Sequence, residues 1–247
     1  MKLSIVIPAF NEAQNLPETI SAFYNTLIKE GIDHEIYVVN DNSTDNTLTV
    51  LDGLKTKVNT LRYITNTPPR NGYGYAVRLG LDHISGDCVA VVMADLSDSP
   101  QDLLAFYKKM RSDNLDCVFG SRFIKGGSIS GYPKTKYIIN RIANNLVKLV
   151  FAISYNDCTN AFKLYKRQTI EGLKPFLSPH FNFTLELPLK AIVRGYSYAV
   201  LPNSWVNRKN NVSNFKIREM GSRYFFILIY CLIEKYFSKG DFRKKWN

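Results

Sequence analysis

The sequence lacks the features that mark several classes of protein. Its 247 residues include four cysteines, and no two of them form the C-x-x-C pair that commonly binds zinc. No secretory signal precedes Ser4-Ile5-Val6-Ile7, so we expect a reducing, cytoplasmic setting. Cys88 and Cys117 sit in apolar runs and are predicted to be buried thiols. A chain of this length can bury roughly 70–75% of its unfolded surface and needs no disulfides.

Long apolar runs, internal repeats and low-complexity linkers are also missing. Residues 222–237 are almost continuously apolar, but Arg223 and Glu234 bound the run, and a membrane span needs about 20 apolar residues. We therefore expect one large domain over residues 1–218, followed by an apolar and basic helix over 219–247.

Acidic residues (21) are fewer than Lys and Arg (32), so the formal net charge is +11. From residue 205 to residue 247, ten Lys and Arg stand against three acidic residues, so much of the excess lies at the C-terminus. Such a charge favours an anionic partner, namely a nucleotide or an anionic membrane. A nucleic acid is not expected, because the remaining basic residues are scattered and not interleaved with aromatic ones. The C-terminal helix is expected to contact a membrane surface, the domain itself, or a second subunit.

Short apolar segments alternate with helical patterns through the first half of the chain. The predicted strands cover residues 4–8, 35–40, 61–65, 88–94 and 116–120. This order predicts an α/β fold with a mostly parallel central sheet and helices on both faces. In the second half, strands are predicted at 157–167 and 196–206, around a helix at 183–194.

Ligands of such sheets bind at the carboxyl ends of the strands, so the loops there are the first to consider. Asp41 directly follows a strand and can accept a hydrogen bond from a nucleobase. Arg70 lies in a Gly- and Pro-rich loop and could bind a diphosphate. Asp95 could hold Mg²⁺ or Mn²⁺ against phosphates, and Arg122 ends the next strand. Together these residues suit a nucleotide diphosphate.

Each of these residues also has a structural interpretation. Asp41 could have no role beyond an Asx turn with Ser43. Asp95 and Asp98 precede Pro100 and could have no role beyond starting a helix. Arg70 alone could be a solvated charge. The functional interpretation depends on all of them meeting at one edge of the sheet.

Several segments together resemble a known family. They are SIVIPAFNE (4–12), VVNDNSTDNT (38–47), ISGDCVAVVMADLSDSP (84–100), GSRFIKGG (120–127), NAFKLYKR (160–167), FNFTLELPLKAIVRGY (181–196) and NRKNNVSNFKI (207–217). As a set, these segments resemble family-2 glycosyltransferases of the GT-A fold, a Rossmann-like α/β architecture. The most similar branch is that of dolichyl-phosphate mannosyltransferase and its bacterial polyprenyl-phosphate relatives.

The resemblance implies roles for particular residues. Those expected to bind the donor are Pro8, Ala9, Asn11, Glu12, Asp41, Arg70, Ala94 and Asp95. Those expected to bind the acceptor phosphate are Arg122, Arg141, Arg208, Ser213 and Lys216. The residues expected to act in catalysis are Asp95, Arg70 and Arg122, with Asp95 as the second acid of the D-x-D metal motif.

The sequence departs from the family pattern at the metal motif and in the last block. Met93 replaces the first acid of D-x-D, and Asp98 is a candidate to replace it as a ligand of Mg²⁺ or Mn²⁺. Ser97 stands where the branch usually has glutamine. Asn211 and Asn214 replace the usual glycine and lysine, although Lys216 is close.

The predicted reaction is metal-assisted, inverting transfer of a sugar from a nucleotide-diphosphate sugar to a polyprenyl phosphate. The acceptor oxygen is already anionic, so no general base is required. We expect a peripheral enzyme on the inner face of the membrane, alone, as a homo-oligomer or with a small membrane partner. A sugar hydroxyl acceptor would need a base, with Asp98 or Glu186 as candidates. A third alternative is a binding subunit without activity. The sequence leaves the sugar and the nucleobase open.

Overall fold

The computed structural model describes residues 1–207 and 217–244, with the backbone alone for 217–220. The first half holds β1 (Leu3–Ala9), α1 (Leu16–Lys29), β2 (His34–Asn40), α2 (Thr47–Lys55), β3 (Leu61–Thr65), α3 (Tyr73–His83), β4 (Cys88–Val91), α4 (Pro100–Ser112) and β5 (Cys117–Ser121). The second half holds β6 (Ser128–Ser130), α5 (Lys134–Phe151), β7 (Lys163–Lys166), α6 (Arg167–Gly172), α7 (Phe183–Val193), β8 (Tyr198–Pro202), β9 (Ser204–Val206) and α8 (Ile217–Phe237).

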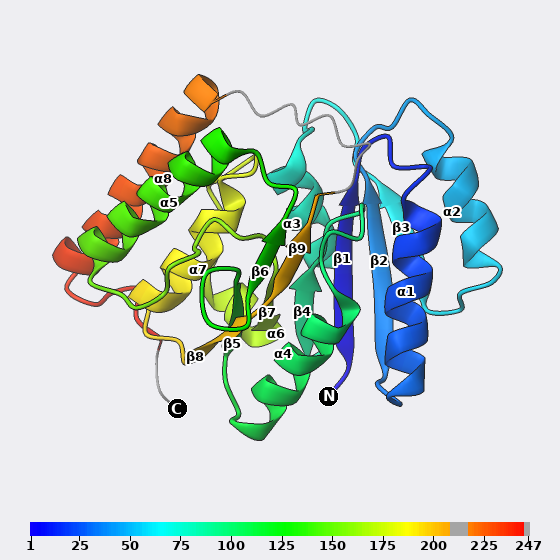
Figure 1. Cartoon of the computed structure of the whole chain (residues 1–247), viewed down its shortest axis with the longest axis horizontal. Coiled ribbons are helices and arrows are strands. Elements are labelled where there is room, and N and C mark those ends of the chain that lie inside the picture. The colour runs from blue at the N-terminus through cyan, green and yellow to red at the C-terminus, as the bar shows by residue number, and fades with distance from the viewer. Residues whose placement is uncertain (208–216, 245–247) are drawn as a thin grey trace.

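Seven strands form the central sheet, in the order β3-β2-β1-β4-β7-β5-β8 (Figure 1). Every neighbouring pair is parallel except the two that involve β7, which runs antiparallel to both β4 and β5. Strands β6 and β9 form a separate parallel pair. The predicted α/β fold with a mostly parallel sheet is therefore confirmed, and the reversed strand is an addition that periodicity did not reveal.

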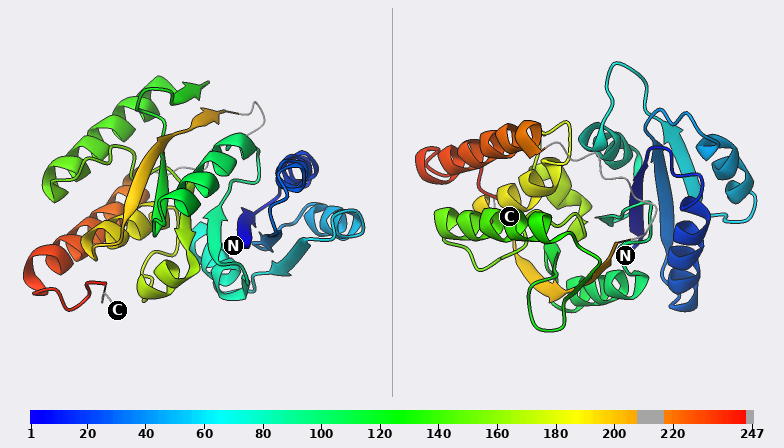
Figure 2. Two further views of the ribbon diagram at one scale, coloured as in Figure 1. Left: turned by 90° about the horizontal axis from the view of Figure 1, so that it is seen from below. Right: turned by 45° about the horizontal axis from the view of Figure 1, so that its top comes forward.

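The side chains of the strands alternate between two apolar layers. Ile5 and Ile7 point into the layer covered by α1, α2 and α4, where Phe23 and Phe106 are fully buried. Val6 and its neighbours on the other face meet α3, α5, α6, α7 and α8. Both faces are thus covered, and the oblique views show helices on each side of the sheet (Figure 2). The four cysteines are buried thiols, as expected for two of them.

The predicted strand 196–206 is divided in the structure into β8 and β9, which belong to different sheets. Two other predicted strands are shorter. Strand β4 ends at Val91 and not at Ala94, because the N–H of Met93 donates to the Asp98 carboxylate (3.1 Å) and not to a neighbouring strand. The predicted strand 157–167 is reduced to β7, because residues 157–160 form a turn in which Asn160 N donates to Asp157 O.

Helix α8 packs on α7 as the C-terminal element. Ile227 and Cys231 are fully buried, and Glu234 pairs with Arg194 of the segment that follows α7 (Nε–Oε1 2.6 Å). Among the described helices, α8 included, none is long and apolar enough to cross a bilayer. The expected C-terminal helix is present, and it contributes side chains to the second apolar layer.

Candidate active site

The ends of β1 and β2 lie side by side and join their loops. Pro8 pairs in register with Val39, and the N–H of Asp41 donates to the carbonyl of Ala9 (2.7 Å). Asn11 has a left-handed backbone (φ 57°), and its side-chain oxygen accepts the N–H of Thr44 (2.7 Å). The predicted donor loop at 8–12 and the loop after Asp41 therefore form one surface at the carboxyl edge of the sheet.

The Asp41 carboxylate connects this surface to the loop that contains Arg70. One oxygen accepts from Asn66 Nδ2 (2.8 Å) and the other from the N–H of Gly72 (2.7 Å). The side chain that accepts the Ser43 N–H is Asn40, so the local turn does not use Asp41. Asp41 is buried and Arg70 is exposed at the surface of the loop. The structure thus brings the two residues to the same edge.

A second group of acids follows β4. Asp95 Oδ1 accepts the N–H of Ser97 (3.0 Å), and Asp98 Oδ2 accepts the N–H of Met93. The cap of α4 is Ser99, whose Oγ accepts the Asp102 N–H, so neither Asp95 nor Asp98 serves as the cap. The Asp98 carboxylate therefore lies at the backbone of the residue that replaces the first acid of D-x-D.

Carboxyl groups are concentrated at this loop. Burial raises the pKa of Asp98 to about 7, and the nearby charge of Asp95 adds to the effect. Burial also raises the pKa of Glu12, with further contributions from Asp95 and Asp45. Ala94, between the strand and the acids, is held by α1, because Thr19 Oγ1 donates to its carbonyl (2.7 Å). Carboxylates that are brought together in this way favour a cation among them.

The acids do not form a complete protein cage for a metal ion. Within residues 1–207 and 217–244, no three His, Cys, Asp or Glu side chains are grouped as such a site would need. Asp95 and Asp98 remain as a pair of carboxylates separated by two residues. Mg²⁺ commonly uses one or two carboxylates and takes its other ligands from water and substrate phosphates, so the pair fits that ion.

Arg122, at the end of β5, is fixed by a buried acid. Asp157 accepts from Arg122 Nε (2.9 Å), Nη2 (2.8 Å) and the backbone N–H (3.0 Å). The side chains of Arg122 and Asp157 are 7% and 0% exposed. Two of the five guanidinium donors are used in this pair, which sets the plane of the group.

Arg141, on α5, meets Arg122 at an aromatic ring. The two guanidinium carbons lie 4.0 Å (Arg141) and 5.4 Å (Arg122) from the centre of the Phe123 ring. Arg141 Nη1 also donates to the carbonyl of Asn156 (3.0 Å), and Asn156 Nδ2 donates to the carbonyl of Phe123 (3.2 Å). Phe123 and the turn at 156–157 therefore bring together two predicted acceptor residues, Arg122 and Arg141. Sequence reasoning missed both Phe123 and this turn.

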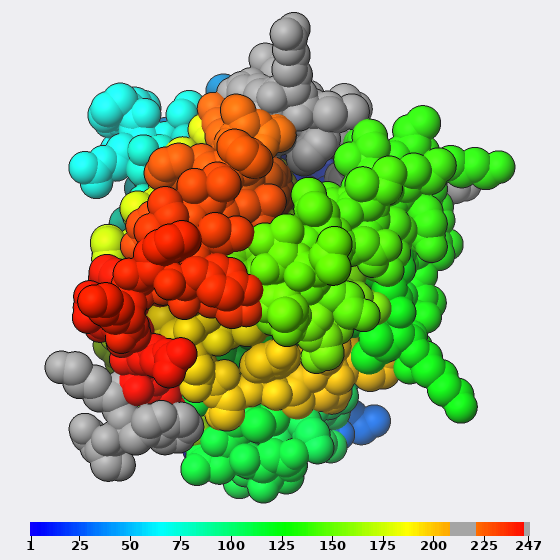
Figure 3. All heavy atoms as spheres, turned by 90° about the vertical axis from the view of Figure 1, so that its left-hand side faces the viewer, coloured from blue at the N-terminus to red at the C-terminus, as the bar shows by residue number. Residues whose placement is uncertain are grey.

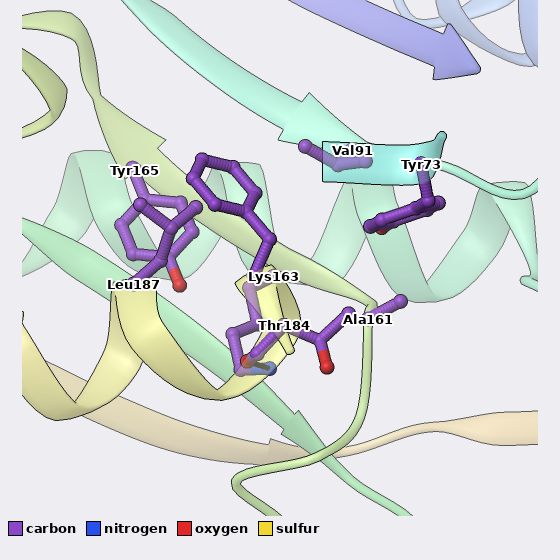
Figure 4. A pocket seen from close by; sticks show the side chains of 8 residues that line it. Tyr73, Val91, Ala161, Lys163, Tyr165, Thr184 and Leu187 are labelled. Carbon is purple, nitrogen blue, oxygen red and sulfur yellow. Dashed lines mark hydrogen bonds between the residues drawn. The ribbon is translucent and has the colours of Figure 1, made fainter. Parts of the chain in front are cut away.

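The side chain of Lys163 donates hydrogen bonds to the same turn. Its Nζ donates to the carbonyls of Cys158 (3.1 Å), Asn160 and Thr184 (3.1 Å). Burial lowers the pKa of Lys163 to about 7. Figure 4 shows its side chain reaching toward Thr184 of α7, in the wall of a small cavity that Tyr73 and Tyr165 also line. This lysine joins the turn, β7 and α7, and it is a further residue that sequence reasoning did not select.

The remaining predicted residues fall into two groups. Glu186 is fully buried, and its oxygens accept from Lys190 Nζ (2.6 Å) and from the N–H groups of Leu177 and Ser178. Its carboxylate thus holds a loop and is not placed to act as a base. The other group lies outside the described residues and consists of Arg208, Ser213 and Lys216. The segment that leads to them runs beside the acidic loop, because Val206 N donates to Ser97 O.

Solved structures share the fold of this chain. Glucosyl-3-phosphoglycerate synthase from Mycobacterium tuberculosis, in complex with Mn²⁺, UDP and phosphoglyceric acid, aligns with a TM-score of 0.69. The alignment covers 95% of this chain and 78% of that chain at 18% identity. The same enzyme with Mg²⁺ and UDP gives 0.68. At this identity the likeness concerns the fold, which is the GT-A architecture.

The family follows from sequence comparison. The model described as "Glycosyl transferase family 2" matches residues 4–173, and the chain belongs to this family. The chain is 26% identical over 234 residues to the polyprenol monophosphomannose synthase of Mycolicibacterium smegmatis, covering 89% of this chain and 86% of the relative. It is 30% identical over 193 residues to the dolichol-phosphate mannosyltransferase of Pyrococcus furiosus, covering 77% of this chain. It spans about half (53%) of that second relative.

Proposed function

We propose that this protein transfers a sugar from a nucleotide-diphosphate sugar to a polyprenyl phosphate. The observation that carries the proposal is the sorting of charge along one sheet edge. Asp41, Asp95 and Asp98 follow β2 and β4, whereas Arg122 and Arg141 meet at Phe123 beyond β5. The names of the two curated relatives support an acceptor of this kind.

The donor would bind on the side of β1, β2 and β4. Pro8, Ala9, Asn11 and Glu12 would line the nucleoside, and Asp41 would accept a nucleobase N–H. Both oxygens of Asp41 accept hydrogen bonds from the loop 66–72, so the incoming base would exchange with at least one of them. That exchange would release the loop to bring Arg70 to the diphosphate.

A divalent cation would be held by Asp95 and Asp98 together with the diphosphate. Burial is the main cause of the raised pKa of Asp98, and the charge of Asp95 adds to it. A cation bound by both carboxylates would offset both effects, which supports the fit. When bound, Mg²⁺ or Mn²⁺ would supply neutralisation of charge on the leaving diphosphate. The structural neighbours with Mn²⁺ or Mg²⁺ and UDP support a cation of this class.

The acceptor phosphate would bind between Arg122 and Arg141. Asp157 fixes the plane of the first guanidinium, and Asn156 O holds the second, so both are oriented before the acceptor arrives. The phosphate oxygen is already anionic and attacks the sugar carbon without a general base. The protein contributes position and charge complementarity, and the family resemblance implies inversion. Arg208, Ser213 and Lys216 would complete this side.

Product analysis tests the proposal directly. The purified protein is incubated with Mn²⁺ and a labelled UDP- or GDP-sugar, and the mannose donor is tested first. The acceptor is either a polyprenyl phosphate or a soluble sugar. We expect label in the lipid product only. Label in a soluble glycan would favour the hydroxyl acceptor, with Asp98 as the base, and the absence of both products would favour a binding subunit.

The Asp95→Asn substitution tests the role of the acidic loop. We expect it to abolish turnover with each acceptor, because the remaining amide cannot neutralise a cation, while the midpoint of urea unfolding changes little. Calorimetric titration of the same variant would show loss of cation-dependent binding of the nucleotide sugar. Retained turnover in Asp95→Asn would contradict the proposed metal position.

A further inference from the structure

Helices α5 and α8 carry most of the large apolar side chains that the described part of the molecule exposes. Twelve of the nineteen such residues lie on these two helices. They are Tyr137, Ile138, Ile139, Ile142, Leu146 and Leu149 on α5, and Phe225, Phe226, Ile229, Ile233, Tyr236 and Phe237 on α8. We call this set the two-helix face. Its most exposed members are Leu149 (79%) and Phe237 (72%).

The spacing of these residues puts all of them except Tyr137 on one side of their helix. On α5, residues 138, 142, 146 and 149 form a stripe, while Asn144, Val147 and Phe151 on the opposite side are buried. On α8, residues 225, 229, 233 and 236 repeat the same intervals, with Ile227, Cys231 and Glu234 buried opposite. Each helix is therefore anchored by one side and presents an apolar stripe on the other.

The two stripes belong to one surface. Near the ends of the helices, Lys235 Nζ donates to the carbonyl of Phe151, and Tyr236 Oη donates to that of Val150 (3.3 Å). Figure 3 shows α8 and α5 next to each other over one face of the molecule, and the ribbon views agree. Contiguous exposed apolar surface of this kind is uncommon on a protein that only contacts water.

The charges on this surface select its partner. Helix α5 contains no acidic residue, and within the described side chains of α8 the one acid, Glu234, is buried against Arg194. The exposed charges on the described parts of these two helices are basic, with Lys134 and Lys148 on α5. After α8, the exposed Lys239 and Arg243 outnumber the one exposed acid, Asp241. Two copies of such a face would repel each other, whereas an anionic bilayer complements both the apolar stripes and the basic rim.

We propose that the two-helix face lies on an anionic lipid bilayer, with both helices in the plane of the interface. The sequence drew attention to the C-terminal helix alone, and the structure adds α5 as an equal part of the surface. Helix α5 also carries Arg141, one position before Ile142. If the proposed function holds, α5 therefore places a phosphate-binding arginine at the level of the lipid headgroups, where a polyprenyl phosphate presents its own phosphate.

Vesicle flotation tests this proposal without any acceptor. The full-length protein is mixed with vesicles of phosphatidylcholine alone or with about one-third phosphatidylglycerol. We expect binding to the anionic vesicles, and we expect Ile142→Ser, Leu146→Ser and Leu149→Ser combined to weaken it by about a hundredfold or more. These side chains are exposed, so the combined variant should fold. The matched control is Ile28→Ser, at an equally exposed apolar residue on α1 (54%), which should bind like the parent protein.

The charged rim has its own test. The Lys134→Ser and Lys148→Ser substitutions should each reduce binding to anionic vesicles by about fivefold and leave the weak binding to neutral vesicles unchanged. Added salt should have the same effect as these substitutions.

Two results would overturn the proposal. One is a triple α5 variant that binds anionic vesicles as strongly as the parent protein does. The other is a dimer, measured by light scattering, that the same variant dissociates, because the face would then belong to a second copy of the chain. The proposed function is tested separately with a water-soluble, short-chain polyprenyl phosphate, on which the triple variant should keep the parent activity. Loss of vesicle binding and loss of transfer can thus be told apart.

Discussion

At the scale of single residues, the buried pair of Arg122 and Asp157 is central to the proposed acceptor side. Its three hydrogen bonds fix a cation where few water molecules reach it. Such a pair adds little net stability compared with apolar residues, but leaving one partner alone is costly. The pair therefore serves orientation and makes the site sensitive to substitution at Asp157.

We expect Asp157→Asn to lower the free energy of unfolding by about 3–5 kcal/mol, because Arg122 would remain buried without a counter-charge. Urea unfolding measures the change. The matched control is Asp82→Asn, which removes one of the two acidic partners of the exposed Lys174 (3.4 Å) and leaves Glu171 (2.9 Å); it should cost less than about 1 kcal/mol. Equal effects of the two substitutions would show that the buried pair does not hold the site together.

Glu35 predicts a dependence of stability on pH. Burial alone would raise its pKa, but hydrogen bonds from Ser4 and Ser85 and the charge of Lys2 lower the pKa to about 2. A carboxyl with a lower pKa in the folded state stabilises the fold above its unfolded pKa, and this contribution is lost as the pH falls toward 2. We expect the stability difference between the parent and Glu35→Gln to be constant above about pH 5 and to shrink below it. A difference that stays constant down to pH 2 would contradict this assignment.

At the scale of elements, helix α3 packs unusually close to the sheet. A Cβ atom at Gly80 would lie 2.5 Å from Val6 Cγ1 and 3.1 Å from Val39 Cγ2, so only glycine fits between α3 and the strands β1 and β2. This contact sets the position of α3, whose first turn follows the loop held by Asp41.

We expect Gly80→Ala to destabilise the protein by about 1–3 kcal/mol through overpacking, although alanine is the better helix former. Gly53→Ala on α2 is the matched control, because no atom lies within 4 Å of its added Cβ, and it should stabilise by about 0.5–1 kcal/mol. Adding Val6→Ala to Gly80→Ala should recover part of the loss. Thermal unfolding of the parent and these three variants measures the differences, and stabilisation by Gly80→Ala would refute the close packing.

The elements also show what sequence reasoning could and could not reach. Strand ends that follow periodic apolar runs were predictable, and with them the positions of Asp41 and Asp95. The pairing of Arg122 with Asp157 was not, because 35 residues separate the partners and neither has a periodic signal. The end of β4 was missed for a similar reason, since a side chain (Asp98) and not the apolar pattern takes the Met93 N–H.

At the scale of the whole molecule, the C-terminal helix is integrated with the rest. Besides Ile227 and Cys231, the pair of Arg194 and Glu234 joins α8 to the segment after α7, and Lys244 bonds Asp116 near β5 (2.8 Å). The boundary predicted at residue 218 therefore separates segments that share an apolar layer.

We expect a chain that ends at residue 216 to unfold at a clearly lower urea concentration than the parent, or to aggregate. Truncation would expose the apolar side of α7 and leave Arg194 buried without Glu234. Circular dichroism in increasing urea measures the midpoint. An unchanged midpoint would mean that residues 217–247 form a separate unit, as the sequence-based division suggested.

Strand β7 lies between two groups of loops at the edge of the sheet where β4 and β5 end. Because it runs against its neighbours, its first residue and not its last lies at the edge where β4 and β5 end, and the turn before it arrives there as well. In the proposed function, the nucleoside would be recognised by loops from one flank of this strand and the second substrate by segments from the other. If so, substitutions on one flank of β7 should change the use of one substrate and leave the binding of the other unchanged.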